Sequence, residues 1–328
     1  MAEPIDYAAE YDNSGRVANS AQLKDAYPIN AMAFRETAKF AHYDLAYGPE
    51  ERNKLDMFWP SEDRDCPVVI FIHGGYWQSL DRKTFSHMAK GLNDHGMAVA
   101  MPSYTLAPKA TVETIINEMR RACITLYQTL ERKLTVVGHS AGGHLAACML
   151  ATQWDTIHED LPHDLISSGM GVSGLYDLTP LLKTPVNDAL GMDEAHAASA
   201  SPIAWVPDAT HRFEAWVGGD ESDEYHRQSR ELADRWNLLG TPTNYVSLPG
   251  TNHFTIIDDL TRSGSRMVKR VVELVESPTE TSDIPDPDEA DIAAVLLSGE
   301  DQGDPTNEDQ QEQANPSEQS ERVGDIVN

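Results

Sequence analysis

The sequence is poor in cysteine and in basic residues, and it contains no long hydrophobic run. No apolar stretch approaches the roughly 20 residues that a membrane-spanning helix needs, and the N-terminus lacks the basic and apolar regions of a secretory signal. The cysteines Cys66, Cys123 and Cys148 are odd in number and have no metal-ligand spacing, which indicates free thiols in a reducing compartment. We therefore expect a cytoplasmic protein with no membrane partner.

Charge of one sign dominates the chain, which has 53 acidic and 25 basic residues and a formal net charge of −28 at pH 7. This balance argues against a nucleic-acid partner, because a phosphate backbone is bound by basic surfaces. Residues 277–328 are rich in Pro, Glu, Asp, Gln and Ser and contain Arg322 as their one basic residue. We expect them to form a disordered acidic tail, with a transient helix at residues 290–297 and a partner that the sequence does not identify.

The rest of the chain is long enough to bury a sizeable core. Residues 1–45 are polar with scattered aromatic residues and are expected to be an N-terminal lead-in that packs on the domain and borders its pocket. Residues 46–276 are expected to form the main folded domain. Between residues 176 and 207 lies a long irregular stretch, which we expect to be a lid or pocket wall with Leu178, Leu181 and Leu182 on its inner side.

Alternating apolar patterns run through residues 46–276. Strands are expected at residues 54–59, 68–73, 97–101, 134–137, 170–173, 213–218 and 244–248. Helices are expected at residues 30–40, 85–95, 111–130, 141–152, 225–239 and 267–276. This alternation predicts one doubly wound α/β domain with a mostly parallel sheet.

The most informative stretch is Gly138-His-Ser-Ala-Gly142, which follows a short β-rich run and precedes a small-residue apolar segment. It fits G-x-S-x-G, a strand–turn–helix elbow that places a serine above a parallel sheet. Glycines two residues either side of the serine relieve crowding in so sharp a turn. The pattern therefore identifies Ser140 as the candidate nucleophile.

A serine nucleophile needs a base within hydrogen-bond reach, and a carboxylate to orient that base. Where this elbow occurs, the acid and then the histidine follow the serine along the chain. His253 stands in a loop directly after the last predicted strand, at the sheet edge where open α/β sheets bind ligands. The acid is expected just past residues 213–218, as Asp220 or Glu221, and a G-x-x-acid turn from Gly218 favours Glu221.

His73-Gly-Gly-Tyr-Trp77 follows another buried strand and predicts a loop for the negative oxygen of an acyl-transfer intermediate. Such backbone N–H donors contribute about 3 kcal/mol each to catalysis. We expect Gly74, Gly75 and Ala141 to be these donors. The aromatic residues that follow the two glycines, Tyr76 and Trp77, are expected to reach the rim of the substrate pocket.

Two other kinds of site have little support in the sequence. The glycines around Ser140 do not match G-x-G-x-x-G, so a dinucleotide cofactor is not expected. His139 and His144 lack the H-E-x-x-H spacing of a zinc site. We expect neither a metal nor another cofactor.

Together, these motifs resemble those of the α/β-hydrolase-type kynurenine formamidases, or arylformamidases, over roughly residues 45–275. The similar segments are His73-Gly-Gly-Tyr-Trp77, Gly138-His-Ser-Ala-Gly-Gly-His144, Ser173-Gly-Leu-Tyr-Asp-Leu178 and the run from Glu221 to Ser229. Tyr104-Thr-Leu-Ala-Pro108 is similar to a motif of the hormone-sensitive-lipase-like esterases, with Thr105 where arginine is usual.

The resemblance implies an α/β-hydrolase fold, a triad of Ser140, His253 and the Asp220/Glu221 pair, and N-formyl-L-kynurenine as substrate. In this family the acid comes just before Ser-x-Glu-aromatic, which again favours Glu221, although relatives usually have aspartate. The main alternative is a short-chain carboxylesterase acting on aryl or alkyl esters. An alternative of another class is a non-catalytic binding protein on a hydrolase fold. In either enzyme reading the partner is a small ester or formamide.

Overall fold

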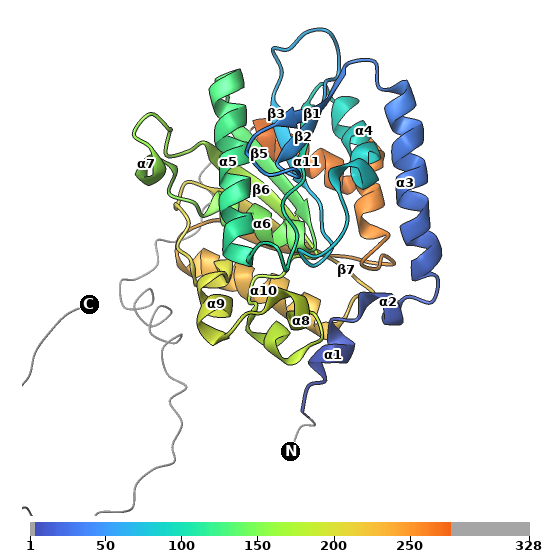
Figure 1. Ribbon diagram of the computed structural model, residues 1–328, viewed down its shortest axis with the longest axis vertical. Helices are drawn as coiled ribbons and strands as arrows, with labels where there is room; N and C mark the ends of the chain where they lie inside the picture. The colour runs from blue at the N-terminus through green and yellow to red at the C-terminus, as the bar shows by residue number, and fades with distance from the viewer. Residues whose placement is uncertain (1–3, 277–328) are drawn as a thin grey trace, which may run out of the picture.

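The computed structural model describes residues 4–276, and the acidic tail, including residues 290–297, lies outside that range (Figure 1). In residues 4–276 the strands are β1 (Ala41–Ala46), β2 (Lys54–Phe58), β3 (Val68–Ile72), β4 (Ala98–Pro102), β5 (Leu134–His139), β6 (Ile166–Val172), β7 (Arg212–Gly218) and β8 (Thr243–Leu248). They form one sheet in the order β1-β2-β4-β3-β5-β6-β7-β8. In this order, the neighbouring strands β4, β3, β5, β6, β7 and β8 pair in parallel. Strand β2 is antiparallel to both β1 and β4. The predicted doubly wound, mostly parallel α/β class is confirmed.

The helices connect and cover these strands. The α-helices are α1 (Tyr7–Glu10), α2 (Asn13–Arg16), α3 (Ser20–Thr37), α4 (Lys90–Asn93), α5 (Val112–Leu130), α6 (Ala141–Leu150), α7 (Trp154–Ile157), α8 (Asn187–Leu190), α9 (Glu194–Ser199), α10 (Asp223–Leu238) and α11 (Arg266–Glu276). The 3₁₀ helices are η1 (Arg82–Ala89), η2 (Thr179–Lys183), η3 (Pro202–Ala204) and η4 (Ile256–Thr261). No helix within residues 4–276 is long and apolar enough to cross a membrane.

The sheet is buried on both faces, which explains why its central strands are continuous apolar runs. On β3, Ile70 and Ile72 belong to one hydrophobic cluster, while Val69 and Phe71 belong to the other. Helices α5, α6 and α10 contribute to the first cluster, and η1, α4 and α11 to the second. In Figure 1, α5 lies to the left of the strands, and α4 and α3 lie to the right.

Most expected elements lie within a few residues of their predicted positions, but the N-terminal region differs. The helix expected at residues 30–40 is α3, which begins at Ser20 and contains Pro28 in its interior. Strand β1 was not predicted at all. Its side chains are mostly exposed, so it lacks the apolar alternation that reveals a half-buried strand. The irregular stretch at residues 176–207 contains the short helices η2, α8, α9 and η3.

The carboxylate of Asp56 ties the N-terminal region to the sheet. Its side chain on β2 is fully buried and lies 2.6 Å from Arg35 Nη1 of α3 and 3.0 Å from Arg82 Nε of η1. The backbone N–H of Asp44 on β1 also donates to Asp56, at 2.8 Å. One buried acid therefore joins two strands, α3 and η1, and neutralises two cations.

We predict that Asp56→Asn lowers the free energy of unfolding by about 3 kcal/mol, because the buried Arg82 then loses its one fully buried counter-charge and keeps the half-exposed Asp44 and Asp81. Urea unfolding of the full chain measures this loss. Asp94→Asn is the matched control, since Asp94 pairs with Lys90 on the surface, and it should change stability by about 0.5 kcal/mol or less. Equal effects of the two substitutions would contradict the structural role of Asp56.

Candidate active site

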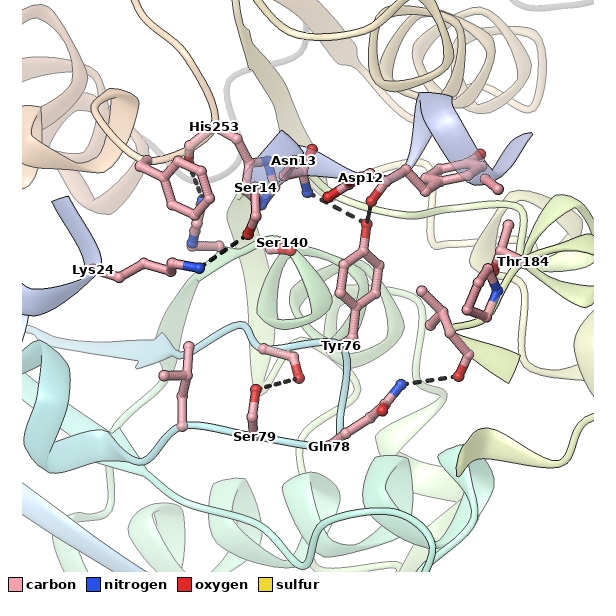
Figure 2. Close-up of a pocket in the computed structure, with 18 of the residues that line it drawn as sticks. Asp12, Asn13, Ser14, Lys24, Tyr76, Gln78, Ser79, Ser140, Thr184 and His253 are labelled. Atoms are coloured by element: carbon pink, nitrogen blue, oxygen red, sulfur yellow. Dashed lines mark hydrogen bonds between the residues drawn. The ribbon is translucent and has the colours of Figure 1, made fainter. Parts of the chain in front are cut away.

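A cavity of about 860 Å³ opens at the carboxyl ends of the central strands (Figure 2). In the sheet, β4 lies on one side of β3, and β5 to β8 lie in chain order on its other side. The direction in which successive strands are added therefore reverses between β3 and β5. Open α/β sheets place ligands at such a reversal. Gly75 after β3, Ser140 after β5 and His253 after β8 all line the cavity.

Ser140 stands at the turn between β5 and α6, with φ of 58° and ψ of −121°. A β-carbon on Gly138 would lie 1.9 Å from the carbonyl oxygen of Gly142, and one on Gly142 would lie 2.0 Å from that of Ile72. The turn is therefore closed by backbone packed on backbone. The sequence pattern predicted that crowding would require glycines, and the structure identifies the atoms that cause it.

His253 is held by Glu221. The ring atom Nδ1 lies 2.7 Å from Glu221 Oε2, and the two side chains are 7% and 1% exposed. The other carboxylate oxygen, Oε1, accepts hydrogen bonds from Ser173 Oγ at 2.5 Å and from the backbone N–H of Gly218 at 2.7 Å. With three donors on its carboxylate, Glu221 has a fixed orientation, and it fixes the orientation of the imidazole.

Asp220, the other candidate acid, is exposed. Its backbone N–H donates to the carbonyl of Thr251 at 3.0 Å, but within residues 4–276 its carboxylate has no hydrogen-bond partner. The structure thus brings Glu221 and not Asp220 into contact with His253. Inside the described range neither Ser140 Oγ nor His253 Nε2 makes a hydrogen bond, and both residues line the cavity.

The loop after β3 brings glycine backbone close to Ser140. A β-carbon on Gly74 would lie 2.8 Å from the Ser140 β-carbon, and Gly75 has φ of +107°, which favours glycine. Ala141 is the first residue of α6, where a backbone N–H has no partner inside the helix. Within residues 4–276 the N–H groups of Gly74, Gly75 and Ala141 have no acceptor.

The structure separates the two aromatic residues that follow the glycines. Tyr76 lines the cavity, and its hydroxyl donates to the carbonyl of Tyr11 at 2.7 Å. Trp77 is fully buried, packs against His144 in a T-shaped arrangement with ring centroids 5.0 Å apart, and is not among the lining residues. Its position after the glycines places it beneath the loop and away from the pocket rim.

The 176–207 stretch does reach the cavity, but through other residues than expected. Leu178 and Leu181 are fully buried in the core and do not line it. The wall is formed instead by three consecutive residues after η2, which are Thr184, Pro185 and Val186.

The N-terminal region contributes more of the lining than its sequence revealed. The lining residues from this region are Ala8, Ala9, Tyr11, Asp12, Asn13, Ser14, Lys24 and Tyr27. Asn13 donates to the Tyr225 hydroxyl at 2.8 Å, and the Tyr225 ring packs on His253 with centroids 4.9 Å apart. The lead-in therefore contacts the imidazole through one intermediate side chain. No local motif signals this, because the contacts span more than 200 residues of chain.

Two further histidines support the site as buried rings, each held by a hydrogen bond through one ring nitrogen. His139 Nε2 lies 2.9 Å from the carbonyl of His253, and burial lowers the pKa of His139 well below its usual range. His73 donates from Nδ1 to the carbonyl of Gly74 at 2.8 Å and stacks on Tyr104, with centroids 4.4 Å apart. Burial lowers the pKa of His73 to about 4. Both rings are neutral near pH 7 and hold loops in place.

The described residues contain no cluster of three or more His, Cys, Asp or Glu side chains arranged to hold a metal ion.

Comparison with known proteins gives consistent matches. A family model described as BD-FAE matches residues 55–235. The kynurenine formamidase of Danio rerio is 33% identical over 240 residues, covering 71% of this chain and 81% of that protein. A proposed thioesterase from Silicibacter sp. TM1040 superposes with a TM-score of 0.73 at 29% identity, covering 82% of this chain and all of that one. A hyperthermophilic esterase from Pyrobaculum calidifontis superposes with a TM-score of 0.61 at 17% identity, covering 78% and 92%, which is a likeness of fold alone.

We predict that Glu221→Gln lowers kcat for hydrolysis of p-nitrophenyl acetate by about 10³-fold or more, because an amide facing Nδ1 favours the wrong imidazole tautomer. Asp220→Asn is the matched control one residue away and should lower kcat less than about 3-fold. Steady-state kinetics on both variants measures the two effects. A larger loss in Asp220→Asn than in Glu221→Gln would transfer the orienting role to Asp220.

Proposed function

The chain belongs to the α/β-hydrolase family that contains the kynurenine formamidases, and we propose that it removes the formyl group from N-formyl-L-kynurenine as an arylformamidase. At the coarser level, the protein is a hydrolase with formamidase or esterase activity. One observation carries the proposal. A serine on a strained elbow and a histidine held by a buried glutamate line the same cavity.

In the proposed reaction, Ser140 Oγ attacks the formyl carbon while His253 Nε2 takes the hydroxyl proton. Nε2 is suited to this task because Nδ1 is occupied by Glu221. The carboxylate stabilises the imidazolium that forms, and its own contacts with Ser173 and Gly218 keep it from turning away.

The tetrahedral intermediate carries a negative oxygen, which the N–H groups of Gly74, Gly75 and Ala141 bind. His253 then gives its proton to the leaving aniline nitrogen, and the C–N bond breaks. Water attacks the formyl-enzyme by the reverse path, releasing formate and restoring Ser140. No cofactor takes part in these steps.

The cavity suits a flat aromatic leaving group. Tyr27, Phe85 and Phe254 line it together with Tyr76, so part of the wall of the cavity that contains Ser140 is aromatic. Its volume of about 860 Å³ lies within the usual range for small-molecule pockets. Because the backbone of Gly74 packs directly against Ser140, we expect little room for the acyl group there, which favours a one- or two-carbon acyl group.

We predict that the full chain hydrolyses N-formyl-L-kynurenine with a higher kcat/KM than p-nitrophenyl acetate, and that Ser140→Ala lowers kcat for both by about 10⁴-fold or more. Ser199→Ala, the same change at an exposed position, is the control and should leave both rates unaltered. Thermal unfolding of each variant checks that the fold is intact.

Two outcomes would count against this function. Retention of more than a tenth of wild-type turnover in Ser140→Ala would remove that serine from the mechanism. A steady rise in activity from aryl acetates to aryl octanoates, with no turnover of the formamide, would replace the formamidase with a carboxylesterase.

A further inference from the structure

Two formally charged side chains lie among the residues that line the catalytic cavity, and they have opposite signs. These are Asp12 and Lys24, and both come from the N-terminal region. Both lie outside residues 55–235, the part of the chain that the family model covers. Figure 2 shows the two side chains on either side of Ser14, on the same side of the cavity as His253.

Lys24 has no acidic partner within residues 4–276. Its ammonium donates to Ser14 Oγ at 3.0 Å and lies 5.8 Å from the centre of the Phe254 ring. Lys83 and Lys90, by contrast, form ion pairs, Lys90 with Asp94 at 2.5 Å and Lys83 with Asp44 at 3.4 Å. In a chain with a formal net charge of −28, an unpaired cation at the cavity is available to an anionic ligand.

Asp12 is the complementary anion. Its Oδ1 accepts the backbone N–H of Gly15 at 2.9 Å, which caps α2, and in the described range it forms no ion pair. Asp12 lies on the turn at residues 12–15, and the ammonium of Lys24, a residue of α3, contacts Ser14 of the same turn. Aromatic rings line the cavity beside them. The cavity thus combines aromatic lining residues with two side chains of opposite charge, each in contact with the turn at residues 12–15.

We propose that Lys24 and Asp12 bind the carboxylate and the ammonium of an α-amino acid carried by the leaving group, and so select zwitterionic aryl formamides over neutral ones. The proposal rests on the arylformamidase function above. The formyl carbon faces Ser140, the ring lies among the aromatic side chains, and the amino acid extends to the turn at residues 12–15. Neither charged side chain takes part in bond breaking. Both residues act on which substrate is bound.

The test compares two substrates that differ in the amino acid alone, which are N-formyl-L-kynurenine and the neutral N-(2-acetylphenyl)formamide. In the full chain, Lys24→Met should lower the ratio of their kcat/KM values about 10-fold, mainly through KM. Lys24→Arg should keep most of the ratio. Asp12→Asn should also lower it, and because asparagine caps helices as well as aspartate does, α2 is preserved.

Lys109→Met is the matched control, since Lys109 is an exposed lysine outside the cavity and its loss should leave the ratio at the wild-type value. A second readout is ionic strength. Added salt should raise KM for N-formyl-L-kynurenine in the wild type and have little effect in Lys24→Met, because screening weakens an exposed ion pair. An unchanged ratio in Lys24→Met, or equal losses with both substrates, would overturn the proposal.

A binding experiment separates failure of this proposal from failure of the formamidase function. Calorimetry compares L-kynurenine with 2-aminoacetophenone, which lacks the amino acid, on the wild type and on Lys24→Met. Tighter binding of L-kynurenine that is lost in Lys24→Met supports the charged subsite even if neither formamide is hydrolysed. Equal affinity of the wild type for the two amines overturns it even if formamides are hydrolysed.

Discussion

The site depends on backbone packed directly against backbone around Ser140. Gly142 lies against the carbonyl of Ile72, and Gly74 lies against Ser140 itself, so the loops after β3 and β5 meet with no side chain between them. A β-carbon at either glycine would be closer than van der Waals contact allows. This contact holds the serine above the sheet and brings the glycine N–H groups beside it.

The site also depends on contacts that hold the His253 imidazole from two directions. Glu221 fixes Nδ1, and Ser173 and Gly218 in turn fix the carboxylate. On the other side, Tyr225 packs on the ring and accepts a hydrogen bond from Asn13. The N-terminal region is thus part of the catalytic cavity, and Asp56 secures that same region to the sheet through Arg35.

A feature of this protein can be predicted from the sequence when it depends on neighbouring residues, and it cannot when it depends on contacts between distant ones. Buried parallel strands are recognised because each is a local apolar run, and the fold class followed from their alternation with helices. Strand β1 was missed because its exposed side chains carry no such pattern. Helix α3 begins at Ser20, earlier than expected. Proline usually interrupts a helix, so a helix that continues through Pro28 is not expected from the sequence.

The sequence by itself determined the doubly wound fold, the elbow at Ser140 and the glycine loop after β3. Each of these depends on residues within a few positions of one another, where sterics and periodicity act directly. Only the tertiary structure distinguished Glu221 from Asp220, buried Trp77 beneath its loop and brought Lys24 to the cavity. Those outcomes depend on which loops meet in space, and neighbouring residues in the sequence do not encode the distances between them.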